Sequence, residues 1–294
     1  MGEKPALRPR EPVGSALVAI AHDILAEARA ALDEPAEAAA VHDYRKAMKR
    51  WRAYLRLLEP FLGGEANRLR IEARDLARQL AGARDVQAAL DALADIEKAE
   101  LPLSKTSLTT MRSRIEDIRR AAETTTLTPD TRGELRAALA SADRAVDSWP
   151  LGHAEFGEIA GELGRTFRRA RRAVPAAWRQ AEAEELHELR QRVVAHRYQM
   201  ELVEPLWPRL GKRWVAEAQR LRERLGSHQD LVVLGRLTAP HQPLAPWRAR
   251  LEPLIDQRKA SHIGAAKRLA ARLFAERPSA FRRRLEALWE NLGG

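Results

Sequence analysis

The chain has 294 residues, a formal net charge of +10 and a sequence pI near 10.4. Hydrophobic residues make up 45% of it and aromatic residues only 5%, a balance that favours helices over sheets. It has no cysteine, which excludes disulfides and thiolate metal sites, and no apolar run long enough to span a membrane. The basic charge points to an acidic partner.

The first residues are polar and include prolines, so we expect no signal peptide, a disordered tail over 1–11 and a cytoplasmic location. Helical periodicity then runs along nearly the whole chain and is broken by proline, glycine and threonine clusters. It predicts helices over 13–33, 37–60, 65–81, 84–99, 105–123, 130–148, 154–173, 178–204, 209–226, 228–236, 246–275 and 278–291. The sequence therefore predicts an all-α protein.

A row of cations lies in the segment 42–56. On a helix, His42, Arg45, Lys49, Arg52 and Arg56 fall inside an arc of roughly 80° that contains no acid, and apolar residues cluster on the opposite side. An ordinary exposed helix face mixes both signs of charge, whereas like charges one turn apart repel each other. The row is therefore typical of a surface that binds a polyanion.

The same pattern returns 145 residues later. The sequence His-x-x-Arg at 42–45 recurs at 187–190, and 12 positions are identical, with no gap, between 41–86 and 186–231. Chance would give about three identities, so the chain contains two copies of one module. We expect a first helical bundle over 12–149 and a second over 150–294.

The two copies differ in charge. Val194 stands at the position of Lys49, and Glu201 stands at the position of Arg56. The second basic stripe is therefore thinner than the first, and we expect the two half-sites to be unequal.

Another basic stripe opens the second copy. Arg165, Arg168, Arg169 and Arg172 fall within about 100° of arc on a helix, and no acid follows before Glu182. Taken alone, such a stripe is compatible with a solvated surface. Beside two other basic helices in a duplicated fold, it favours a part of the same anion-binding site.

These motifs resemble those of a known family. His-x-x-Arg-x-x-x-Lys-x-x-Arg at 42–52 resembles the signature that opens a CHAD domain, the conserved-histidine α-helical domain, and residues 186–198 resemble it a second time. Leu80–Asp85 and Leu225–Asp230 are similar to the family's leucine–glycine–aspartate segment, once in each half. The resemblance covers roughly 12–291.

The resemblance implies a fold and a ligand. It implies two antiparallel helical bundles, related by a pseudo-two-fold axis, whose basic helices face a shared central channel. It also implies binding of inorganic polyphosphate, with sulfate or phosphate ions able to take its place, and association with polyphosphate granules. It implies no cofactor, and we find no nucleophile or metal site in the sequence, so we expect a protein that is not an enzyme.

The predicted site combines the residues that match the family's basic positions with four others: Arg56 from the stripe at 42–56, the equivalent pair Arg68 and Arg213, and Lys212 beside Arg213. The full set is His42, Arg45, Lys49, Arg52, Arg56, Arg68, Arg165, Arg168, Arg169, Arg172, His187, Arg190, Arg197, Lys212 and Arg213. We expect Asp85 and Asp230 to lie outside this site, as helix N-caps or as partners that orient an arginine.

Three other functions are weighed against this one. His22-Asp23 and His42-Asp43 resemble metal-binding pairs of a phosphohydrolase family, but Arg45, Lys46 and Lys49 disfavour a metal there. A nucleic-acid-binding protein is disfavoured because the stripes carry no aromatic residues on which bases could stack. A protein-interaction scaffold is compatible with polyphosphate binding.

Overall fold

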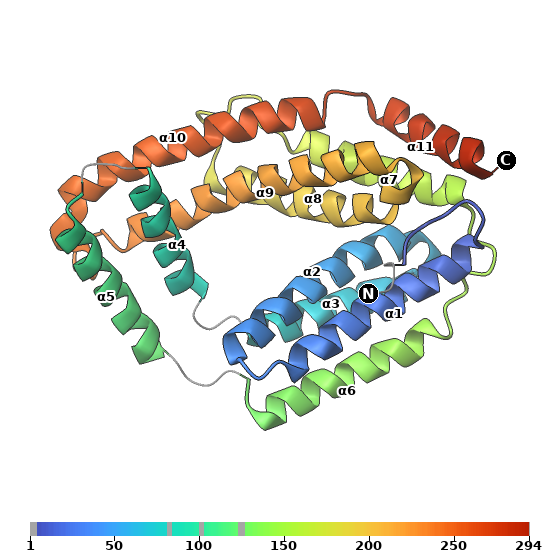
Figure 1. Ribbon diagram of the computed structural model, residues 1–294, viewed down its shortest axis with the longest axis horizontal. Helices are drawn as coiled ribbons and strands as arrows, with labels where there is room; N and C mark the ends of the chain where they lie inside the picture. Colours follow the sequence, from blue (N-terminus) through green and yellow to red (C-terminus); the bar gives the residue numbers. More distant parts are fainter. Residues whose placement is uncertain (1–4, 81–83, 100–102, 123–126, 294) are drawn as a thin grey trace.

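The computed structural model describes residues 5–80, 84–99, 103–122 and 127–293. Within these ranges the chain consists of α-helices and two short 3-10 helices without a strand, which confirms the all-α prediction (Figure 1). The helices of the first copy are α1 (Val13–Asp33), α2 (Glu37–Leu62), α3 (Gly64–Gln79), α4 (Arg84–Lys98), α5 (Lys105–Ala122) and α6 (Pro129–Val146). Those of the second are α7 (Phe156–Arg172), α8 (Ala183–Leu202), η1 (Glu204–Leu206), α9 (Pro208–Arg236), η2 (Ala245–Trp247), α10 (Arg248–Leu273) and α11 (Pro278–Gly293).

One predicted helix break lies two residues later than expected, and another does not occur. α2 continues through Pro60, because a proline in the last turn removes only one backbone hydrogen bond, and the helix ends at Gly63 with a φ of 53°. The segments 209–226 and 228–236 form the single helix α9, in which Gly226 is buried against α8. The equivalent segment of the first copy, 81–83, lies outside the described residues.

The helix bounds follow the sequence repeat. An offset of 145 carries α2 onto α8 together with η1, α3 onto the first half of α9, and α5 onto α10. α3 and α4 are thus two helices in the first copy, whereas their equivalents in the second copy form the single helix α9.

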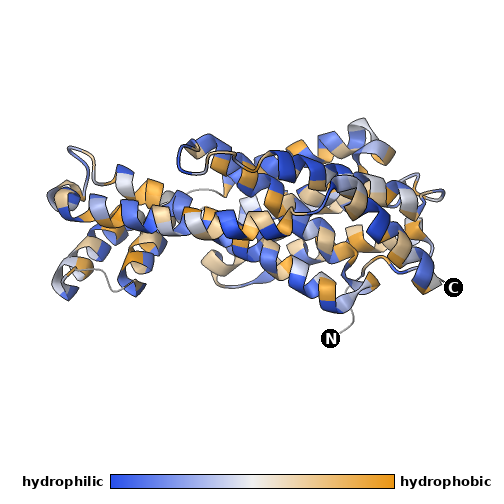
Figure 2. Cartoon of the chain, turned by 90° about the horizontal axis from the view of Figure 1, so that it is seen from above, coloured by the Kyte–Doolittle hydropathy of each residue, from blue (hydrophilic) through white to orange (hydrophobic). Residues whose placement is uncertain are grey.

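The larger hydrophobic core is shared by both copies. It contains residues of α1, α2, α3 and α6, and of α7, α8, α11 and the adjoining halves of α9 and α10. Trp51 stacks on Trp149 with ring centroids 5.9 Å apart, and Phe167 stacks on Phe281 at 4.4 Å. Hydrophobic and hydrophilic residues lie side by side along each helix, as expected for helices with one buried face (Figure 2).

A second, smaller core joins α4 and α5 of the first copy to α9 and α10 of the second. Asp95 on α4 binds two side chains of α10: the Arg258 guanidinium at 2.7 Å and the His262 Nε2 at 2.8 Å. The hairpin of α4 and α5 therefore packs on the other copy, at one end of the molecule (Figure 1).

α2 and α8, which carry the two His-x-x-Arg sequences, touch each other directly. Ala53 packs against Ala195 and Tyr198, and the Gln199 side-chain amide donates to the Ala53 carbonyl at 2.9 Å. Ala53 and Tyr198 are equivalent positions in the two copies. The N-terminal segment also reaches the second copy, since Leu7 is fully buried and its amide donates to the Leu202 carbonyl.

Candidate anion-binding site

The predicted basic stripe lies along one side of α2. The opposite, buried side of the helix holds Tyr44, Met48, Trp51 and Leu55, as the sequence pattern predicts. Arg45, Lys49, Arg52 and Arg56 are half-buried, whereas His42 is exposed near the start of the helix.

Arg52 is surrounded by positive charge. Burial lowers the pKa of its guanidinium, and Arg45, Arg74 and Arg78 lower it further by repulsion. The buried Nε of Arg52 has no hydrogen-bond partner among the described residues. A buried cation held among other cations is unfavourable unless an anion joins it.

Arg56 shows the same effect more strongly. Burial, followed by repulsion from Arg70, Arg192 and Arg52, lowers its pKa from the ordinary 12.5 to about 10, while Glu59 opposes this fall. Arg192 belongs to α8, so this group of charges is built from both copies.

These contacts define a basic cluster on three helices. Its members are Arg45, Arg52 and Arg56 on α2, Arg70, Arg74 and Arg78 on α3, and Arg192 on α8. Three carboxylates lie at its edge: Glu59 is 3.8 Å from Arg70, Asp75 is 2.9 Å from Arg74 and 3.7 Å from Arg78, and Glu188 is 3.1 Å from Arg192. Among the described residues, seven cations against these three paired anions leave the basic cluster strongly positive.

Four members of the basic cluster were not predicted from the sequence. Arg70, Arg74 and Arg78 lie four residues apart and so share a face of α3, a pattern that was visible but is interrupted by Glu72 and Asp75. Arg192 gives no such signal, because it lies on a different face of α8 from Arg190 and Arg197.

Arg45 is held by the backbone. Its Nη1 donates to the carbonyl of Leu80 at 2.8 Å and more weakly to that of Ala77 at 3.4 Å, at the C-terminal end of α3. The last carbonyls of a helix have no partner within the helix, so this guanidinium satisfies one of them. Arg45 therefore links α2 to α3 as well as contributing charge.

Its equivalent in the second copy occupies a similar place. The guanidinium of Arg190 lies against Gly226 of α9, where an added Cβ would come within 3.5 Å of Nε and Nη2. His187, one turn before Arg190, is half-buried on α8.

Arg197 does not join the basic cluster. It forms an ion pair with Glu201 one turn later, and its guanidinium stacks over the ring of Tyr198 at 4.0 Å from the centroid. It lines a separate groove of about 800 Å³ between α1, α2 and α8, which contains side chains of both charges.

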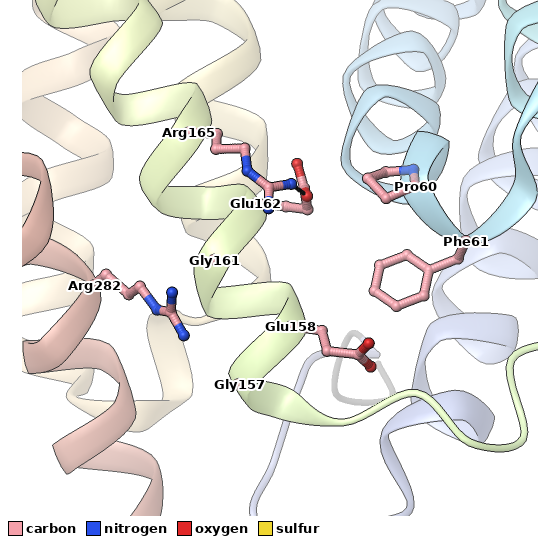
Figure 3. A pocket seen from close by; sticks show the side chains of 8 residues that line it. All are labelled: Pro60, Phe61, Gly157, Glu158, Gly161, Glu162, Arg165 and Arg282. Atoms are coloured by element: carbon pink, nitrogen blue, oxygen red, sulfur yellow. Dashed lines mark ion pairs between the residues drawn. The ribbon is translucent and has the colours of Figure 1, made fainter.

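The basic stripe formed by Arg165, Arg168, Arg169 and Arg172 lies on α7 and has two parts. Arg165 forms an ion pair with Glu162 and lines a pocket opposite Pro60 and Phe61, at the end of α2 (Figure 3). Arg168, Arg169 and Arg172 are exposed, and no carboxylate of the described residues lies within ion-pair distance of them.

Three predicted residues lie away from the basic cluster. Arg68 is exposed on α3 and pairs with Glu65 at 2.7 Å and with Glu72 at 3.4 Å. Lys212 and Arg213 are exposed on the first turns of α9. The structure thus brings together Arg45, Arg52 and Arg56 of the predicted set, and adds four arginines to them.

Two residues of the phosphohydrolase alternative, His22 and Asp23, have other partners. His22 binds Asp143 at 2.7 Å and Asp147 at 3.2 Å, both at the end of α6, whereas Asp23 pairs with Arg50. Within the described residues no group of three His, Asp or Glu side chains is placed to hold a metal ion. The hydrolase interpretation therefore finds no support in this geometry.

Comparison with known proteins gives a consistent picture. The family model of the CHAD domain matches residues 16–239. The crystal structure of the CHAD domain from the plant Ricinus communis superposes with a TM-score of 0.60 at 20% sequence identity, over 97% of this chain and 95% of that one. No curated protein sequence matches the chain. Among the described residues, no helix is long and apolar enough to cross a membrane.

Proposed function

The chain belongs to the CHAD domain family, and we propose that it binds inorganic polyphosphate at the basic cluster without cleaving it. The observation that carries this proposal is the position of Arg52 and Arg56, which are half-buried among other arginines. Such a cluster is costly by itself and becomes favourable when a polyanion neutralises it.

The geometry suits a flexible chain of phosphates. Arg45 and Arg56 are eleven residues apart on α2, which corresponds to about 16 Å along the helix and to several consecutive phosphates. Arginine donates to two phosphate oxygens at once through its planar fork, so a cluster of arginines holds the chain more firmly than lysines would.

The same geometry disfavours nucleic acid. Tyr44, Trp51 and Tyr54, the aromatic residues of α2, are buried in the core and offer no surface on which bases could stack. We therefore expect polyphosphate to compete better than transfer RNA or duplex DNA at equal phosphate concentration.

Titration calorimetry with long-chain polyphosphate tests the proposal. Replacing both Arg52 and Arg56 with glutamate should weaken binding by roughly 100-fold or more, since it removes two charge-assisted contacts and adds repulsion. Arg68→Glu with Arg213→Glu makes the same change of charge at exposed positions outside the basic cluster and should weaken binding only a few-fold.

Equal losses in the two double variants would mean that net charge alone attracts the ligand. No loss in the Arg52 and Arg56 variant would overturn the assigned site, provided that circular dichroism shows both variants folded. The same samples, assayed for released phosphate with and without Mg²⁺, should show none.

We further propose that this binding places the protein on polyphosphate granules in the cell. A fluorescent fusion should then coincide with stained polyphosphate, and the Arg52→Glu and Arg56→Glu double variant should be diffuse. A variant that stays on the granules would show that a different surface directs the location.

A further inference from the structure

The groove that contains Arg197 is the counterpart, in the other copy, of the part of the basic cluster that surrounds Arg56. The four residues whose charges act on Arg56 all have an equivalent, 145 positions away, in the lining of this groove. The equivalents of Arg52, Glu59, Arg70 and Arg192 are Arg197, Glu204, Val215 and Ala47. Arg56 itself corresponds to Glu201, which lines the groove as well.

This correspondence follows from the way α2 and α8 meet. The two helices touch at Ala53 and Tyr198, which are equivalent positions. On one side of this contact, residues that follow Ala53 on α2 therefore approach residues that precede Tyr198 on α8. On the other side, residues that precede Ala53 approach residues that follow Tyr198. Arg56 meets Arg192 on one side, and Glu201 lies with Ala47 on the other.

The exchanged residues make this second site less basic than the first, although Arg8, Lys46 and Arg50 also line it. Two arginines of the basic cluster are replaced by the uncharged Val215 and Ala47, and a third is replaced by a carboxylate. That carboxylate, Glu201, accepts a hydrogen bond from the one arginine that is retained, Arg197. Arg197 is only 14% exposed, so its cation is neutralised within the protein.

We infer that Glu201 takes the place of a phosphate in the second copy, so that the chain binds polyphosphate at one side of the α2–α8 contact and excludes it from the other. This inference rests on the proposed function. It makes Glu201 a specificity-determining residue, and it predicts that the groove accepts the anion once its own charge pattern is replaced by that of the basic cluster.

A transposed variant tests the inference at constant composition. Arg56→Glu with Arg70→Val gives the basic cluster the residues of the groove, and Glu201→Arg with Val215→Arg gives the groove the residues of the basic cluster. The first pair alone should abolish binding of sodium tripolyphosphate. Adding the second pair should restore it by about tenfold or more, because two arginine–phosphate contacts return.

A matched control separates the groove from net charge. Ala249 and Glu252 lie on an exposed face of α10, away from both sites. Ala249→Arg with Glu252→Arg adds the same charge as the groove substitutions and should restore nothing in the Arg56→Glu and Arg70→Val background. Restoration by this control would overturn the inference.

The outcomes distinguish the two proposals. Failure of the unaltered protein to bind tripolyphosphate would refute the proposed function itself. Binding by the unaltered protein without restoration in the folded transposed variant would refute only the role of Glu201. If the transposed variant does not fold, Glu201→Arg with Val215→Arg in the otherwise unaltered chain decides instead: the number of sites should rise from one to two, and an unchanged number would refute the inference.

Discussion

Arg56→Met is expected to stabilise the protein in the absence of ligand while it weakens polyphosphate binding. The fall of the Arg56 pKa from 12.5 to about 10 corresponds to about 3 kcal/mol, at ~1.4 kcal/mol for each tenfold change. Because Arg56 is still in partial contact with solvent, we expect a gain of about 1–2 kcal/mol in the free energy of unfolding when its charge is removed. Methionine keeps the unbranched apolar stem in place.

The sign of the effect with pH is fixed by the direction of the pKa change. The folded protein holds the Arg56 proton less tightly than the unfolded chain does, so the cost is fully present below pH 10 and decreases between pH 10 and pH 12.5. The gain from Arg56→Met should therefore be the same at pH 6 and at pH 8.

Thermal unfolding with and without polyphosphate provides the assay. Without ligand, the variant should melt roughly 2–3 °C above the unaltered protein. At a polyphosphate concentration about 100 times the Kd of the unaltered protein, that protein should gain about 2.7 kcal/mol, and a variant that binds about tenfold more weakly should gain about 1.4 kcal/mol, so the difference between the two melting temperatures should shrink to near zero.

Arg68→Met is the matched control, because Arg68 is exposed and already paired with two glutamates. It should change the stability by less than about 0.5 kcal/mol. A ligand-free Arg56→Met variant that melts below the unaltered protein would refute the view that the basic cluster costs stability.

In contrast to Arg56→Met, Arg45→Gln should lower the free energy of unfolding by roughly 1–3 kcal/mol, because the carbonyls at the end of α3 lose a charged hydrogen-bond donor. Urea denaturation of the variant and the unaltered protein measures this difference. Asp95→Asn should cost about 3 kcal/mol at pH 7, since hydrogen bonds from His262 and Arg258 outweigh burial and hold the pKa of Asp95 well below its usual range. That difference should shrink below about pH 4, where the unfolded chain also binds the proton. Burial lowers the pKa of His196 to about 3 and, together with nearby positive charge, that of His228 to about 4, so stability should fall as the pH decreases from 6.5 towards 4, by up to about 2.7 kcal/mol per pH unit. His228→Gln should remove about half of that slope in denaturation curves recorded between pH 7 and pH 5.

The fold was predicted from local patterns that act within one helix. Helical periodicity placed both ends of α1, α2, α5 and α11 within two residues of their observed bounds, which is the usual uncertainty at a helix end. The larger errors came at Gly226, a breaking residue that its surroundings tolerate, and at 178–182, which were predicted as helix although α8 begins only at Ala183. Pro60 sits in the last turn of α2, and Gly226 lies in the middle of α9, where the side chain of Arg190 covers it.

The candidate site was predicted less completely than the fold. The positive charges that surround Arg52 and Arg56 come from different helices. The stripe on α2 could be read from the sequence, since its members share one face of one helix. The approach of α3 and of Arg192 could not, because it depends on how the two copies pack. Arg68 and Arg197 were predicted because they are basic at positions that recur in both copies, and each has an acidic partner on its own helix that the pattern of basic residues does not reveal.

The repeat gives information in its differences as well as in its identities. The identities at an offset of 145 residues, such as Arg52 and Arg197, establish the duplication but do not tell a binding position from a neutralised one. The structure adds which residues meet at the α2–α8 contact and which of the arginines there has an acidic partner. Around Arg56 the exchanged positions change the charge, whereas Glu59 and its equivalent Glu204 keep it. Because Arg52 and Glu59 are retained as Arg197 and Glu204, whereas Arg56 is replaced by the carboxylate of Glu201, the two sides of the contact share one architecture and, on our proposal, differ in the anion they can hold.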